Sequence, residues 1–176
     1  MTNSGLWVGV LTALTALGSS YITARATSRA ALAQARATTT AEALREQRDR
    51  RRSTYREMMN CVHALNEVTW QILDVDATPD RESKSRLLTQ MYERSGPTIA
   101  DMNKATNEVR LDGPAEVATA AEHVRQMARR LQPPLKALID DDGPERRRDY
   151  DDAYKVFREA YVTFIGLARG ALEVKD

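Results

Sequence analysis

The sequence is poor in the residues that usually build covalent or metal-bound sites. It contains one cysteine, Cys61, and two histidines, His63 and His123, in 176 residues. A single cysteine excludes an intrachain disulfide. A di-iron site in a helical bundle requires Glu-x-x-His on two helices, but Asn60 and Ala120 stand three positions before the histidines. We therefore predict no metal site and no cofactor.

Glycine-rich catalytic motifs are also missing. The eight glycines form neither a phosphate-binding loop nor the G-x-S-x-G turn of a hydrolase. Asp140–Gly143 is not a calcium loop, because Leu138 would occupy its first ligand position. His63 and Glu67 share a helix face, which predicts only a surface hydrogen bond. The sequence predicts no catalytic residues and a protein that is not an enzyme.

Helix breakers are absent from a long part of the chain. No glycine occurs between Gly18 and Gly96, and no proline precedes Pro79. The segment 24–43 contains nine alanines, the strongest helix former. We predict a continuous helix that reaches about residue 76, in which residues 25–54 form a solvated basic stalk. No heptad repeat is sustained here, so a coiled-coil dimer requires that the N-terminal segments pair first.

The first long apolar run is Leu6–Ala24, nineteen residues without a charged side chain. As a helix it would be about 28 Å long, close to the hydrocarbon thickness of a bilayer. We predict that residues 1–24 form a transmembrane anchor. A buried helix of a soluble protein is the alternative. A cleaved signal peptide is disfavoured because no basic side chain precedes the run.

Small residues recur along one face of this predicted span. They are Gly5, Gly9, Ala13, Ala16 and Ser20. Such a face allows two helices to approach closely in lipid. Two interpretations stay open: self-association of the span, which would give a homo-oligomer, and the ordinary abundance of glycine, alanine and serine in membrane spans.

Positive charge is concentrated directly after the span. Residues 25–56 contain nine arginines and three acidic residues, a local charge of +6, whereas the rest of the chain to the C-terminus carries −5. The positive-inside rule then places the N-terminus outside and the body in the cytoplasm. We predict that anionic lipid rather than nucleic acid faces this segment, because acids interleave the arginines and no aromatic side chain accompanies them. The predicted inner-leaflet basic neck comprises Arg25, Arg29, Arg36, Arg45, Arg48, Arg51 and Arg52.

Residues 55–176 carry four apolar stripes at helical spacing. The first is Tyr55, Met58, Val62, Leu65, Thr69 and Ile72, with Cys61 beside it as a buried packing residue. Asp80 is a candidate N-cap, Asp112-Gly113-Pro114 marks a stop and restart, and Gly96-Pro97 predicts a kink or short break. We predict an all-α fold whose body is an antiparallel four-helix bundle. Its helices span about 55–76, 81–111, 115–139 and 145–174.

Two segments resemble a set of small, uncharacterised actinobacterial membrane-anchored proteins. These have one N-terminal span, an Arg- and Ala-rich helix and an R-R-x-x-Y start to a helical body, here Arg51, Arg52 and Tyr55. A second similar segment is V-R-L-x-G-P-x-x-V-x-x-A-A, here beginning at Val109 and containing Gly113. The resemblance implies a bacterial cytoplasmic-membrane setting, and it implies no activity or substrate.

These features favour two hypotheses of function. The first is a membrane-tethered helical interaction module, an adaptor or scaffold without catalytic activity whose protein partner the sequence does not name. The second is a membrane-active or transfer-type effector that acts through an oligomerising transmembrane helix. The long and well-patterned body favours the first hypothesis.

Overall fold

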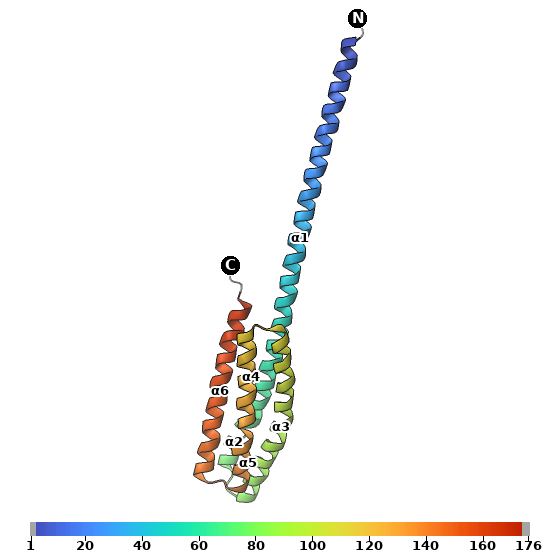
Figure 1. Cartoon of the computed structure of the whole chain (residues 1–176). Coiled ribbons are helices and arrows are strands. Elements are labelled where there is room, and N and C mark those ends of the chain that lie inside the picture. Colours follow the sequence, from blue (N-terminus) through green and yellow to red (C-terminus); the bar gives the residue numbers. More distant parts are fainter. Residues whose placement is uncertain (1–2, 174–176) are drawn as a thin grey trace. The chain divides into compact units, whose positions relative to one another are not determined.

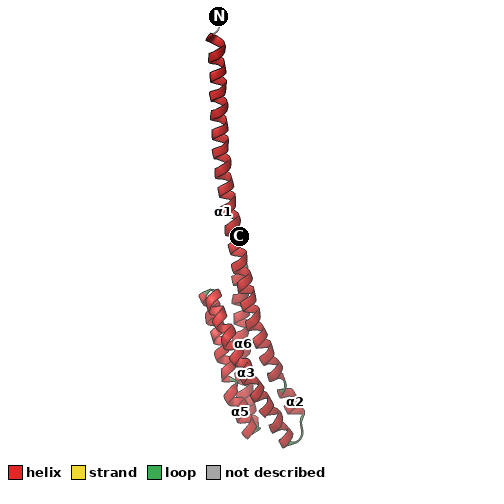
Figure 2. Ribbon diagram, turned by 90° about the vertical axis from the view of Figure 1, so that its right-hand side faces the viewer, coloured by secondary structure: helices red, strands yellow, loops and turns green. Residues whose placement is uncertain are grey.

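The computed structural model describes the backbone of residues 3–173 and the side chains of residues 31 and 34–173. The chain divides into two units, Met1–Glu46 and Gln47–Asp176. Figure 2 shows that all its regular structure in the described range is helical, and no strand occurs there. The predicted all-α class is therefore confirmed.

Six helices occur in the described residues. They are α1 (Asn3–Trp70), α2 (Ile72–Ala77), α3 (Arg81–Asp112), α4 (Ala115–Arg130), α5 (Gln132–Asp140) and α6 (Pro144–Leu172). In the second unit they form four antiparallel rods: the end of α1 with α2, then α3, then α4 with α5, then α6 (Figure 1). The four-helix body is thus present, with two of its rods interrupted.

The ends of the helices follow the local signals in the sequence. Asp80 caps α3, because its carboxylate accepts a hydrogen bond from the backbone N–H of Ser83 at 2.8 Å. That bond also lowers the pKa of the Asp80 carboxyl below its ordinary value. Gly113 ends α3, and Pro144 is the first residue of α6, where a missing N–H costs nothing.

The predicted apolar stripes form the core. Met58, Val62 and Leu65 on α1 are completely buried, together with Met102 on α3 and Phe164 on α6. Cys61 is also buried, as its position beside the first stripe predicts. Burial of large apolar side chains from all four rods removes their surface from water, which is the main driving force for this packing.

The core consists of two hydrophobic clusters. One extends from Tyr55 to Leu65 on α1 and contains Phe157 and Phe164 of α6, whereas the other contains Val68, Ile72 and Tyr150. In each rod, one residue with a polar group stands in the sequence between the buried members of the first cluster and those of the second. These four residues, which we call the polar layer, are Asn66, Ser95, Gln132 and Tyr154. Tyr154 Oη donates to Asn66 Oδ1 at 3.3 Å, and Gln132 Nε2 donates to Ser95 Oγ.

Two rods are interrupted where a single helix was expected. The first is broken at Gln71, whose N–H bonds to Val68 O at 3.3 Å, and the predicted helix 55–76 is divided there. The predicted helix 115–139 is divided at Leu131, two residues before Pro133-Pro134. Pro134 and Pro133 lack the N–H that a continuous helix would use, so α5 restarts with prolines in its first turn.

The expected kink at Gly96-Pro97 is not an interruption. Pro97 lies inside α3, which continues from Arg81 to Asp112. Both Gly96 and Pro97 are exposed. Water can therefore hydrogen-bond the carbonyl that Pro97 leaves without its helical partner, and the helix continues through it.

In the first unit, the described side chains of residues 31 and 34–46 are all exposed. The hydroxyls of Thr38, Thr39 and Thr40 each donate to the carbonyl four residues earlier at 2.9 Å. These bonds satisfy the threonines locally, as a solvated helix requires.

The predicted span Leu6–Ala24 falls outside the residues whose side chains the structure describes. Within the residues that the structure describes, no helix is both long enough and apolar enough to cross a membrane.

Candidate functional site

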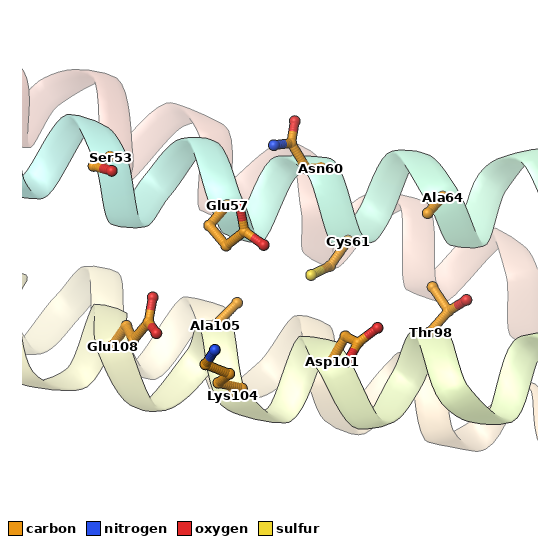
Figure 3. Close-up of a pocket in the computed structure, with 10 residues that line it drawn as sticks. All are labelled: Ser53, Glu57, Asn60, Cys61, Ala64, Thr98, Asp101, Lys104, Ala105 and Glu108. Carbon is orange, nitrogen blue, oxygen red and sulfur yellow. The ribbon is translucent and has the colours of Figure 1, made fainter.

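A groove runs between α1 and α3 along the bundle (Figure 3). Its volume is about 560 Å³. It is lined from α1 by Ser53, Glu57, Asn60, Cys61 and Ala64, and from α3 by Thr98, Asp101, Lys104, Ala105 and Glu108. All ten residues belong to the second unit.

The groove exists because the side chains at its floor are small. Cys61 and Ala105 are buried there, and Ala64 stands at one end. The bulky Met58 and Met102 are fully buried in the core instead. In Figure 3 the sulfur of Cys61 points across the groove towards α3. The two helix backbones are therefore separated by a space that no large side chain fills.

The walls of the groove carry an excess of negative charge. Glu57 lies on α1, and Asp101 and Glu108 lie on α3, with Lys104 as the one cation of the lining. In the described part of the chain, none of these four side chains makes a hydrogen bond or an ion pair. By contrast, Glu122 is held by the guanidinium of Arg125 and has its pKa lowered to about 2.

Cys61 lies in an environment that favours its protonated form. Burial raises the pKa of the Cys61 thiol, and the carboxylates of Glu57, Asp101 and Glu108 raise it further. A protonated thiol is a poor nucleophile and a poor metal ligand. Within the residues that the structure describes, no three His, Cys, Asp or Glu side chains are placed to hold a metal ion.

Hydrogen bonds made by polar side chains also join α1 to α6. Trp70 Nε1 donates to Tyr154 Oη at 3.1 Å, and the indole is 58% exposed. Tyr150 Oη donates to the carbonyl oxygen of Thr69 at 3.5 Å, and the rings of Tyr150 and Tyr154 are stacked with centroids 6.5 Å apart. These contacts hold the end of α1 against α6, and sequence reasoning did not anticipate them.

The predicted basic neck contains residues with different roles. Arg36 and Arg45 are exposed in the first unit, and Arg48 is half-buried in the second. Arg52 pairs weakly with Asp49 at 3.9 Å. Arg51 is half-buried, and its Nε donates to the carbonyl oxygen of Asp112 at 2.9 Å. Arg51 therefore helps to close the bundle.

Other predicted site residues cannot be placed. The small-residue face of Gly5, Gly9, Ala13, Ala16 and Ser20, and the neck residues Arg25 and Arg29, fall outside the described side chains. Their roles stay predictions. The shared face of His63 and Glu67 is confirmed, since His63 Nε2 and Glu67 Oε1 lie 3.4 Å apart on an exposed surface, and a hydrogen bond between them stays a prediction.

Comparison with known protein families, with curated proteins and with solved structures finds no match for this chain.

The groove was not predicted from the sequence, although a signal for it was present. Polar or small residues recur at spacings of three and four beside the apolar stripe of α1, at residues 53, 57, 60 and 64. The same holds for residues 98, 101, 105 and 108 of α3. Either row by itself is typical of a solvated helix face. Only the packing of the two helices shows that these rows face each other.

Proposed function

We propose that this protein is a membrane-tethered helical interaction module, an adaptor or scaffold whose four-helix body binds a protein partner. The observation that carries the proposal is the groove between α1 and α3. It is open to solvent and about 560 Å³ in volume, and its four charged side chains make no hydrogen bond or ion pair in the described residues. Grooves between neighbouring helices are common docking sites for a further helix or peptide.

The tether rests on the N-terminal sequence. Leu6–Ala24 is long enough to cross a bilayer as a helix, and the arginines from Arg25 onward favour a cytoplasmic location of the body. Arg36 and Arg45 are exposed and free of ion pairs in the described range, which suits contact with anionic headgroups. We accordingly place the protein in the cytoplasmic membrane, with its N-terminus outside.

The proposed role requires no catalysis. The groove contains the buried thiol of Cys61 and the hydroxyls of Ser53 and Thr98. The raised pKa of the Cys61 thiol works against nucleophilic attack by this group. No histidine is among the lining residues, so neither hydroxyl has the imidazole base that activates the serine of a catalytic triad. The side chains of the groove are suited to recognition.

The proposal can be tested by site-specific photo-crosslinking in the producing cells. A photoreactive amino acid at Asn60 would sit at the edge of the groove, and the same amino acid at the exposed Asp152 of α6 serves as the control. We expect discrete adducts from position 60 and not from position 152. Identical adducts from both positions, or none from either, would contradict the proposal.

The membrane-active alternative depends on the small-residue face of the span. Deletion of residues 55–176 distinguishes the two functions, because it removes the body and leaves the span and the whole basic neck. An interaction module should then lose all activity in a cellular assay, whereas an effector that acts through its span should retain part of it.

A further inference from the structure

The shape of the groove indicates the form of its occupant. Its α1 wall extends over residues 53–64 and its α3 wall over residues 98–108. At about 1.5 Å per residue, each wall is roughly 15 Å long, or about three helical turns. The groove lies along the helices, which is the geometry in which a third helix packs against two others.

The charges of the groove indicate the chemistry of the occupant. Three carboxylates and one ammonium group give the lining a net charge of −2. Some acids elsewhere on the bundle are paired with bases: Asp76 lies 2.9 Å from Arg147, and Asp142 lies 3.7 Å from Lys84. The groove acids have no such partner in the described residues. An occupant with positive side chains would supply the missing partners.

The spacing of these acids excludes a compact cation. Glu57, Asp101 and Glu108 are spread along both walls, and no three ligating side chains converge in the described residues. A metal ion would require ligands within a few ångströms of one point. Cationic groups arranged along a helix face match this distribution.

The floor of the groove fits small apolar side chains between the cationic ones. Ala105 is 1% exposed and Cys61 is 7% exposed. The thiol of Cys61 points into the groove (Figure 3). Alanine or serine on the docking face of the occupant would fill this space without displacing either wall.

We propose that the groove binds a cationic α-helix of another protein, with arginine or lysine side chains opposite Glu57, Asp101 and Glu108 and small residues against Cys61 and Ala105. This inference rests on the proposed interaction function and adds the class of partner to it. Attraction between the negative lining of the groove and a positive helix also favours association that is rapid and sensitive to salt.

The test uses the full-length chain in mild detergent and a fluorescent alanine-based helical peptide of about 18 residues, a length at which such helices form in water. Three arginines at steps of three and four place the charge on one face of the probe. A matched peptide has the same composition with the arginines distributed around the helix. Fluorescence anisotropy measures binding, and the rate of Cys61 modification by a thiol reagent reports whether the groove is covered.

The variant Glu57→Gln/Asp101→Asn/Glu108→Gln neutralises the groove. Its control, Glu93→Gln/Glu116→Gln/Asp152→Asn, makes the same change of charge at exposed sites outside the groove. We expect the one-faced peptide to bind the natural chain and the control variant equally, to protect Cys61, and to bind the neutralised variant about tenfold more weakly. Circular dichroism should show that all three proteins are equally helical.

Two results would overturn the inference. One is equal binding of both peptides, or equal loss of binding in both variants, because this would mean nonspecific charge attraction. The other is no binding of the one-faced peptide. If photo-crosslinks from position 60 still form in that case, the interaction function stands and only the class of partner is wrong. If they are also absent, both proposals fail.

Discussion

Arg51 Nε donates a hydrogen bond to the carbonyl oxygen of Asp112, 61 residues further along the chain, at 2.9 Å. This bond joins the R-R-x-x-Y segment of α1 to the end of α3. The next residue, Gly113, lies against Tyr55, the last residue of that segment. Two segments that stand out separately in the sequence thus meet at one end of the bundle.

The first prediction concerns Arg51. Arg51→Ala removes a charge-assisted donor from the last carbonyls of α3, so the free energy of unfolding should fall by about 1–2 kcal/mol. Urea unfolding followed by circular dichroism measures the change. Arg52→Ala is the matched control, because Arg52 is exposed and 3.9 Å from Asp49, and it should cost less than about 0.5 kcal/mol. Equal losses from both variants would show that the Arg51 bond is unimportant.

The second prediction concerns Gly113. A Cβ atom at this residue would lie 2.7 Å from the carbonyl oxygen of Val109 and 3.1 Å from Tyr55 Oη. Gly113→Ala should therefore destabilise the bundle by about 1–3 kcal/mol, since backbone and a buried ring must move. Gly166→Ala in α6 meets nothing within 4 Å and should stabilise by about 0.4–1 kcal/mol. Opposite shifts in melting temperature are expected, and a neutral Gly113→Ala would be inconsistent with this close packing.

The third prediction is a pH dependence that arises from Glu122. The hydrogen bond from Arg125 lowers the pKa of this carboxyl from 4.5 to about 2, with further help from Gln126 and Arg110. A lowered folded-state pKa gives stabilisation that is complete well above pH 4.5 and is lost as the pH falls towards 2. Glu122→Gln should thus destabilise by about 0.5–1 kcal/mol at pH 7 and much less at pH 2. A difference between the two proteins that does not change with pH would contradict this origin.

The fourth prediction uses Cys61 as a reporter of the groove. Since carboxylates add to burial in raising the pKa of this thiol, Glu57→Gln should lower that pKa and speed thiol modification at a fixed pH. Asp101→Asn should act in the same direction with a smaller effect. The pH dependence of the modification rate measures the pKa. Glu93→Gln, at an exposed site outside the groove, should leave the rate unchanged. An unchanged rate in Glu57→Gln would show that this carboxylate does not influence the thiol.

The fifth prediction concerns orientation in the membrane. Arg25, Arg29 and Arg36 follow the predicted span, so the body should be cytoplasmic. In a Cys61→Ala background, Asn103→Cys introduces a thiol at an exposed position of α3. It should resist a membrane-impermeant thiol reagent in intact cells and react after permeabilisation. Full labelling of intact cells would place the body outside and would require partners at the cell surface.

The core was predictable because its signal is local. Apolar residues at steps of three and four mark one face of a helix whatever the neighbouring helix is, and Met58, Val62 and Leu65 are buried as expected. The break at Gln71 was not predictable in this way, because no glycine or proline marks it. At Gly96-Pro97 the local signal was strong, yet the helix continues, since both residues face solvent.

The groove shows a different limit. Whether Glu57 faces open water or lines a groove with α3 depends on which helices become neighbours, and no periodicity within one helix specifies that. Arg51 illustrates the same point: its charge suggested lipid, and its partner is a carbonyl from a distant helix end. Predictions from sequence therefore worked for burial within a helix and for the number of rods, and they missed the specific contacts between side chains of different helices.

The polar layer of Asn66, Ser95, Gln132 and Tyr154 has a consequence for cooperativity. Proteins open locally in contiguous cooperative units that differ in stability. The short helices α2 and α5 pack in one cluster, whereas the groove walls run beside the other. One end of the bundle can therefore fray and re-form while the opposite end keeps the groove intact.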